Sequence, residues 1–202
     1  MAIARTSKLE AINTMLSSIG EAPVNDLTAS SATTDVIIAK NILDEVSREI
    51  QSHGWHFNRE TQVLLTPNAL NQIEVSNSVA AFDVEPVDSG NVDYVLRGTK
   101  VYDKTNHTYT ISKPLKATVT YIFDWEDLPQ TARHYFMIKA ARRFQDRVVG
   151  SEKHHSFQEI DEYHALVAFR AAEADEADFT IFHNYDVARI VDRGSVINRV
   201  TT

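Results

Sequence analysis

The chain has 202 residues, with 28 acidic and 20 basic side chains, a formal net charge of −8 and no cysteine. A chain of this length forms one or two domains and buries about 70% of the surface that its unfolded form exposes, so it needs no disulfide or metal to fold. The absence of cysteine excludes a disulfide framework, a thiolate zinc site, an iron–sulfur cluster and a cysteine nucleophile. The acidic balance argues against a protein that binds nucleic acid by neutralising its phosphates, but not against one that surrounds it.

No segment is typical of a signal peptide or a membrane span. Residues 1–6 contain one arginine and no apolar core region. The longest apolar clusters, such as residues 36–39, are far shorter than the ~20 residues that cross a bilayer. The sequence therefore predicts a soluble protein made in the cytoplasm, with no membrane partner.

Two helices are predicted in the N-terminal part of the chain. The first begins after Ser7, which can form a capping box with Glu10, and ends at Gly20. The second is capped by Thr34 or Asp35. In both segments the apolar residues recur at alternating spacings of three and four, which is typical of a helix with one buried face.

Between residues 55 and 128 the hydrophobic period falls toward two, and aromatic and β-branched residues accumulate. This pattern predicts an antiparallel β unit of roughly four to six short strands. Gly98 marks a hairpin turn, and a second turn is expected at residues 105–106. The strand candidates are residues 62–65, 93–96, 100–102, 109–111 and 117–123.

Helical periodicity returns after Pro129 and continues in a second segment beyond Gly150. His164 lies in the apolar seam of the last helix, where a buried, hydrogen-bonded histidine is expected. The seam of the first of these helices comprises Met137, Ala141, Phe144 and Val148, and that of the last comprises Phe157, Ile160, His164, Val167, Ala171 and Ala174.

Together these patterns predict an α+β fold. A helical bundle is built from both ends of the chain, residues 1–54 and 129–178, and a small antiparallel β unit is inserted over residues 55–128. The narrow apolar seams favour near-parallel helix packing. Residues 179–202 show no sustained period and are interpreted as a C-terminal tail.

Charge is distributed unevenly over the last two helices. Residues 129–149 hold five basic side chains against one acidic, whereas residues 151–178 hold eight acidic against two basic. The basic face is either solvated opposite an acidic neighbour in the same molecule, or an interface at which the basic face of one copy meets the acidic face of the next copy in a ring. The charge pattern alone favours the first interpretation. The candidate interface residues are Lys139, Arg142, Arg143 and Arg147.

Motifs for catalysis or cofactor binding are missing from the sequence. The six glycines are too dispersed for a phosphate-binding loop, and neither a nucleophile elbow nor a zinc-binding His-Glu-x-x-His helix occurs. His154, His155 and Glu159 could present an imidazole and a carboxylate to a metal, but a polar helix start is favoured because the other ligands are lacking. The sequence therefore predicts no catalytic residue, no cofactor and no metal.

Two alternative functions stay open. A glycoside hydrolase needs two carboxylates ~5–10 Å apart across a cleft, and two tryptophans could supply platforms on which sugars stack. The same surfaces would serve a monomeric glycan-binding module without turnover. The candidate carboxylates are Glu85, Asp88, Asp124, Glu126 and Asp127, and the tryptophans are Trp55 and Trp125.

Several collinear segments between residues 7 and 150 resemble a known family. They include Ile19-Gly20-Glu21-Ala22-Pro23-Val24, residues 42–58, the hairpin at 94–103 and the helix at 136–150. These segments are similar to the tail tubular protein A family, the head-to-tail adaptors of short-tailed, podovirus-type bacteriophages. The most specific element is Gly54-Trp55-His56-Phe57-Asn58, in which Gly54 ends a helix and the two aromatic residues anchor the first strand in the core.

The resemblance implies a structural virion protein and not an enzyme. Such adaptors form a homo-oligomeric ring, expected to be a dodecamer, between the portal protein and the tail nozzle protein (tail tubular protein B), and help to seat the tail fibres. Double-stranded DNA passes through the ring during ejection as cargo and not as a ligand. The expected location is the virion tail, after assembly in the host cytoplasm. The apolar residues of segment 179–202 lead us to expect that it orders on assembly.

Overall fold

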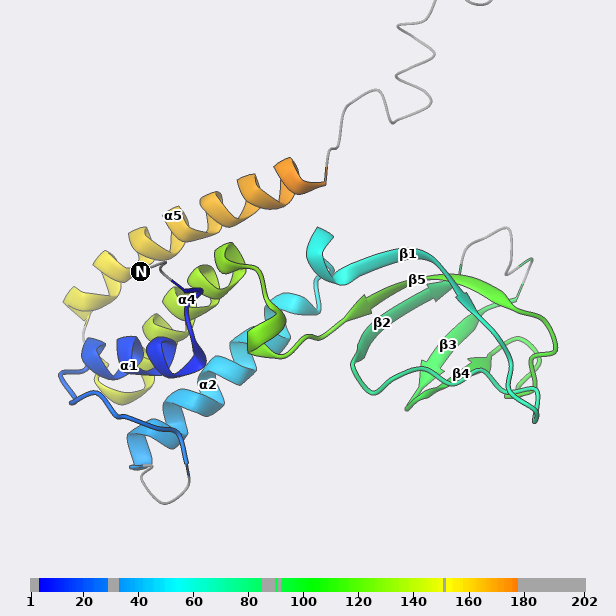
Figure 1. Ribbon diagram of the computed structural model, residues 1–202, viewed down its shortest axis with the longest axis horizontal. Helices are drawn as coiled ribbons and strands as arrows, with labels where there is room; N and C mark the ends of the chain where they lie inside the picture. The colour runs from blue at the N-terminus through cyan, green and yellow to red at the C-terminus, as the bar shows by residue number, and fades with distance from the viewer. Residues whose placement is uncertain (1–3, 29–32, 85–89, 91, 151, 178–202) are drawn as a thin grey trace, which may run out of the picture.

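The computed structural model describes residues 4–28, 33–84, 90, 92–150 and 152–177, except for the side chains of residues 152–158. The fold is α+β, with helices at both ends of the chain and strands between them, as predicted (Figure 1). In chain order the elements are α1 (Lys8–Ser18), α2 (Thr34–Gln51), the 3₁₀ helix η1 (His56–Asn58), β1 (Arg59–Leu65), β2 (Val79–Val84), β3 (Tyr94–Arg97), β4 (Lys100–Asp103), β5 (Leu115–Tyr121), the 3₁₀ helix η2 (Trp125–Asp127), α4 (Gln130–Val148) and α5 (Glu152–Glu176).

Helix α4 is the centre of the helical part. It packs against α1 and α2 on one side and against α5 on the other (Figure 1). Because α4 has neighbours on two sides, its buried face is wider than the predicted seam: Phe136 and Ala140 are fully buried, whereas Val148 is exposed. The core between the helices is built from large apolar side chains, among them Ile12, Leu43, Phe136, Phe144 and Phe169.

The helix starts follow local sequence rules. The Ser7 hydroxyl accepts a hydrogen bond from the Glu10 N–H at 3.2 Å, and Glu10 Oε2 accepts one from the Ser7 N–H at 2.7 Å, which is the predicted capping box. The cap of α2 is Thr33, one residue before the predicted positions. Its hydroxyl accepts from the Val36 N–H, because Thr33 has extended backbone while Thr34 is already helical.

The strands form a three-stranded antiparallel sheet in the order β1-β5-β2 and a separate β3-β4 hairpin. The hairpin turns at Gly98, which has a φ of 63°, as predicted. The strands share an apolar core of their own, separate from that of the helices, formed by Ile73, Val84, Val101, Ile111, Leu115, Ala117 and Val119.

The structure differs from the predicted strands in two places. Strand β2 was missed because its sequence, Val-Ala-Ala-Phe-Asp-Val, does not alternate apolar and polar residues. The predicted strand at residues 109–111 does not form. Ile111 instead donates its N–H to the Asn71 carbonyl at 2.7 Å, so this backbone is paired with a loop and not with a strand ladder.

Buried amides hold together the two chain crossings between helices and strands. Asn58 Nδ2 donates to the carbonyls of Gln51 and Tyr121, at 2.8 and 2.6 Å. Its Oδ1 accepts from the Trp55 N–H at 2.8 Å. These bonds join the end of α2 to the end of β5.

The division into two separate domains, residues 1–54 with 129–178 and residues 55–128, stays a prediction. The tail predicted at 179–202 lies outside the described residues.

Helix α5 packs on a different face from the predicted one. Ala165 and Phe169 are buried, with 5% and 0% of their surface exposed, whereas Ile160 and Val167 of the predicted seam are 55% and 48% exposed. His164, which was expected to be buried between helices, is exposed. The described part of the predicted seam, from Ile160 onward, therefore faces away from the bundle.

An aromatic cluster explains why α5 buries this face and not the predicted one. The Phe169 ring lies with its centroid 4.4 Å from that of Trp55, 5.6 Å from Tyr135 and 6.3 Å from Phe57. On the next turn, the Glu173 carboxylate accepts a hydrogen bond from the His56 N–H at 2.6 Å. Trp55 and Phe57 lie directly before β1 and pack against the helical core, where they also hold α5. The core in which they were expected to anchor the first strand is therefore that of the helices.

Candidate assembly surface

The predicted basic face of α4 meets a row of carboxylates on α2. Lys139 Nζ lies 3.0 Å from Glu49 Oε1, and Arg143 bridges Glu45 at 3.0 Å and Glu49 at 2.8 Å. Both guanidinium Nη atoms of Arg147 donate to Glu45 at 3.0 Å. The three cations are spaced four residues apart and so form one row on α4, which pairs with the i, i+4 row of glutamates on α2.

Arg142 points to the other side of α4. Its Nε lies 2.8 Å from Glu162 Oε2 on α5, and the two side chains are largely buried. Arg142 is one residue from Arg143, which turns it by about 100° around the helix axis. The four cations thus tie α4 to α2 and to α5.

The ion pairs change the proton affinity of the glutamates. The hydrogen bond from Arg147 lowers the pKa of Glu45 and outweighs the smaller opposing effect of burial. Burial, the largest single effect, would raise the pKa of Glu49, but the hydrogen bonds and charges of Lys139 and Arg143 together outweigh it and lower that pKa. Both carboxylates are therefore ionised at neutral pH, and the network is fully charged.

The carboxylates that face the basic side chains of α4 thus belong to the same molecule. Two of them, Glu45 and Glu49, come from α2, and one, Glu162, comes from the acidic residues 151–178. The charges in α4 were evident from the sequence. Their partners on α2 were not, because Glu45 and Glu49 lie 90 to 102 residues earlier in the chain. Contact of Lys139, Arg142, Arg143 and Arg147 with another subunit or with a portal protein stays a prediction.

Arg133 has a structural role that the sequence did not reveal. Its side chain is 3% exposed, and it donates to the carbonyls of Leu128 at 3.0 Å, Thr6 at 2.8 Å and Glu126. The Trp125 indole N–H also donates to the Thr6 carbonyl, at 3.0 Å. These bonds fasten the segment before α1 to η2, at the point where the chain returns from the strands to the helices.

The residues considered for sugar chemistry are only partly gathered. Asp124, Glu126 and Asp127 all lie at η2, whereas Glu85 and Asp88 lie outside the described residues. Trp125 is buried, so its ring is not an open platform for a sugar. The Trp55 ring is half-buried and packs on Phe169, and its N–H donates to the Ile50 carbonyl at 2.8 Å.

The metal candidate is not assembled in the described part of the chain. His154 and His155 belong to the segment of α5 whose side chains are not described, and Glu159 is exposed. Elsewhere, the described residues contain no group of three His, Asp or Glu side chains placed to hold a metal ion. None of the described helices is long and apolar enough to cross a membrane.

Comparison with known proteins agrees with the resemblance in the sequence. The model of the tail tubular protein family matches residues 9–179, from the first turn of α1 to just beyond α5. The chain therefore belongs to the tail tubular protein family. It is 26% identical over 163 residues to tail tubular protein A of Klebsiella phage KP34, covering 79% of this chain and 84% of that protein. The protein is thus a structural component of a bacteriophage tail.

Proposed function

We propose that this tail protein is a ring-forming adaptor that connects the portal protein to the tail nozzle and lets double-stranded DNA pass during ejection. Membership of the tail tubular protein family carries the proposal. The ring is a homo-oligomer of twelve copies, assembled in the host cytoplasm and retained in the virion tail. Its partners are the portal protein, the nozzle protein and the tail fibres.

The shape of the subunit supports this assignment. The helices form one end of the molecule and the strands form the other, and the two are joined by a narrow pair of chain crossings (Figure 1). A protein of this shape offers one end to each of two partners. In the proposed assembly the helical parts stand side by side around the ring and meet the portal, while the β part projects toward the nozzle and fibres.

The charge of the chain suits DNA as passing cargo. A net charge of −8 repels the phosphate backbone, so the DNA slides through without the counterion release that drives tight binding. The basic groups most concentrated in the sequence, on α4, are held in ion pairs with Glu45, Glu49 and Glu162. We assign those four cations to the assembly surface of the helical part.

The test is co-assembly of the full-length chain with the portal protein. Negative-stain microscopy and native mass spectrometry are expected to show a closed ring of this protein on the portal, with the β part pointing away from it. A chain that stays monomeric with and without portal protein would overturn the proposal. Release of reducing sugar from a capsular polysaccharide, or glycan binding without turnover, would favour the hydrolase or the glycan-binding module instead.

A further inference from the structure

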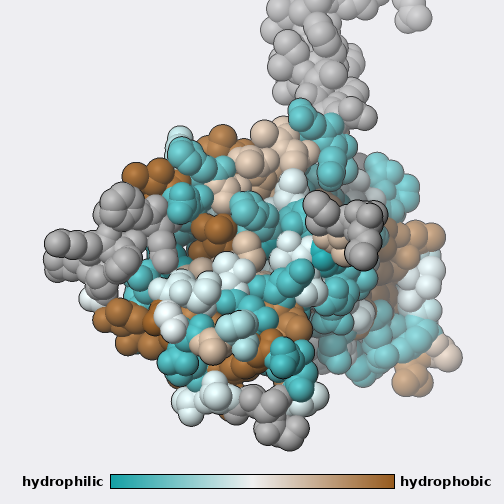
Figure 2. Space-filling view, turned by 60° about the vertical axis from the view of Figure 1, so that its left-hand side comes forward, coloured by the Kyte–Doolittle hydropathy of each residue, from teal (hydrophilic) through white to brown (hydrophobic). Residues whose placement is uncertain are grey.

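The outward face of α5 carries apolar side chains that the fold itself does not use. Tyr163 is 64% exposed, and it lies beside Ile160 and Val167 on this face. His164, Ala171 and Ala174 continue the same face at spacings of three and four, the pattern of a helix that packs against another helix. In Figure 2 apolar surface gathers along the upper edge of the molecule, where α5 lies.

The inner face of α5 is fully engaged, so this outer surface cannot be buried by a rotation of the helix. Phe169 contacts Trp55 and Tyr135, and Glu173 accepts the hydrogen bond from His56. Rotating α5 to bury Val167 would remove Phe169 from the core. The outer face is therefore a permanent surface of the folded subunit, which we call the α5 outer face (Ile160, Tyr163, His164, Val167, Ala171 and Ala174).

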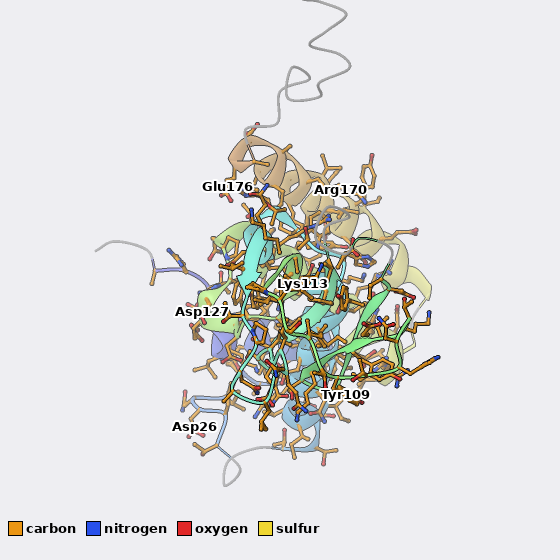
Figure 3. The ribbon with its side chains drawn as sticks, turned by 90° about the vertical axis from the view of Figure 1, so that its right-hand side faces the viewer. Asp26, Tyr109, Lys113, Asp127, Arg170 and Glu176 are labelled. Carbon is orange, nitrogen blue, oxygen red and sulfur yellow. The ribbon has the colours of Figure 1, made fainter. Side chains whose placement is uncertain are left out.

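Charges border the α5 outer face but do not interrupt it. Glu159, Asp161 and Asp175 lie along its margins, and Arg170 is the cation among them. Figure 3 shows Arg170 and Glu176 on α5 at one extremity of the molecule, opposite Asp26 in the segment that precedes α2. An apolar centre with an acidic margin calls for a partner with an apolar centre and a basic margin.

The opposite side of the same subunit carries an exposed face with two cations and one apolar side chain. On α2, Ile37 is 51% exposed, Lys40 is exposed one turn further along the helix and Arg48 about three turns further along. Asp44, which lies on this face between the two cations, is paired with Lys8 at 2.6 Å. Within the described chain, neither Lys40 nor Arg48 forms an ion pair, unlike Lys139, Arg143 and Arg147, whose charges are met by Glu45 and Glu49. We call Ile37, Lys40, Asn41 and Arg48 the α2 outer face.

The two outer faces point in opposite directions because α2 and α5 lie on opposite sides of α4 (Figure 1). A surface on one side that complements a surface on the other joins copies head to tail, and repeated head-to-tail contact closes into a ring when the rotation between copies allows it. A two-fold contact of α5 with α5 would bring like-charged margins together instead.

We infer that the α5 outer face of one copy packs against the α2 outer face of the next, and that this is the subunit contact of the ring. The inference rests on the proposed ring function and names its interface. Ile160 and Val167 lose their exposure against Ile37, while Asp161 and Asp175 approach Lys40 and Arg48. The partner is a second copy of this chain.

The test reverses the charges of each face separately. One variant carries Asp161→Lys and Asp175→Lys, and the other carries Lys40→Glu and Arg48→Glu. Each alone brings like charges together, so each is expected to raise the protein concentration needed for ring formation by roughly tenfold or more. Mixed in equal amounts, the two variants alternate around the ring, every contact regains opposite charges, and rings re-form.

A matched pair of apolar variants completes the test. Val167→Glu on the α5 outer face is expected to prevent ring formation, whereas Leu70→Glu, at a more exposed apolar residue of the β part, leaves it intact. Circular dichroism of each subunit verifies the fold. If the wild-type chain forms rings and both charge variants form them equally well, this interface is overturned but the adaptor function is not. If the wild-type chain forms no ring, the adaptor function is overturned. Loss of assembly in the α5 variant alone, without rescue on mixing, also overturns the interface.

Discussion

The side-chain amide of Gln51 hydrogen-bonds to both backbone polar groups of Phe123. Its Oε1 accepts from the Phe123 N–H at 2.8 Å, and its Nε2 donates to the Phe123 carbonyl at 3.1 Å. The last residue of α2 thereby acts as a strand neighbour for the segment that leaves β5. Since Gln51 is fully buried, the two crossings between helices and strands are fastened by a polar contact shielded from water.

We expect Gln51→Leu to destabilise the protein by about 1–3 kcal/mol, because the Phe123 groups lose their partner while the side-chain volume changes little. Urea unfolding followed by circular dichroism measures this loss. Gln145→Leu is the matched control: Gln145 is also buried, but its Oε1 has no hydrogen-bond partner in the described chain, so removing the amide costs less. Equal losses in the two variants would contradict a special role for the Gln51 contact.

A second prediction concerns Arg133. Replacement by Met keeps much of the side-chain volume but leaves the carbonyls of Leu128, Thr6 and Glu126 without their charged donor, so we expect a loss of about 2–3 kcal/mol in the free energy of unfolding. Replacement by Lys is also expected to destabilise, because an ammonium cannot reproduce the planar fork of the guanidinium. The exposed Arg5→Met serves as the control, and a Met variant at position 133 as stable as that control would refute the role.

Local rules in the sequence were enough to predict the helix starts and the hairpin. The capping box of Ser7 and Glu10 lies within four residues, and the Gly98 turn depends on the conformational freedom of one glycine. Such features involve neighbouring residues only, so no knowledge of the tertiary structure is needed. The α+β order followed because the period of the apolar residues changes from 3.6 to 2 and back along the chain.

The orientation of α5 could not be predicted in this way. Its most regular apolar seam, at Ile160 and Val167, faces outward, and the buried face is set by Phe169, whose partners Trp55 and Tyr135 lie far away in the sequence. The regular spacing of apolar residues shows that a helix has an apolar face, but it does not show what covers that face. The same reason applies to α4, where the cations were evident and the glutamates that pair with them were not.

A third prediction tests the basic face itself. Arg142→Glu with Arg143→Glu places like charges opposite Glu162, Glu45 and Glu49, so we expect weaker ring formation or portal attachment together with a less stable bundle. Co-sedimentation with portal protein and thermal unfolding measure the two effects. Normal assembly by a folded double variant would show that these residues serve only the contacts of α4 within the subunit.

The exchange of a single pair separates the two roles of this face. Arg142→Glu combined with Glu162→Arg restores an ion pair between α4 and α5 while reversing the charge at each position. If the exchange restores the stability of the bundle but not attachment to the portal protein, Arg142 contacts the portal protein directly. Recovery of both assigns Arg142 to the packing of α5 alone.

The last prediction concerns the pH dependence of stability at Glu173. Burial raises the pKa of this carboxyl and outweighs the backbone hydrogen bonds from His56 and Phe57, which lower it. The folded state therefore holds the proton more tightly than the unfolded state, and the free energy of unfolding falls as pH rises from the unfolded pKa, about 4.3, to the folded one. Glu173→Gln removes this titration and keeps an acceptor for the His56 N–H, so its stability relative to wild type should increase over that interval. Thermal unfolding across about pH 4 to 7 measures the difference, with the exposed Glu159→Gln as control, and parallel profiles for wild type and Glu173→Gln would contradict the prediction.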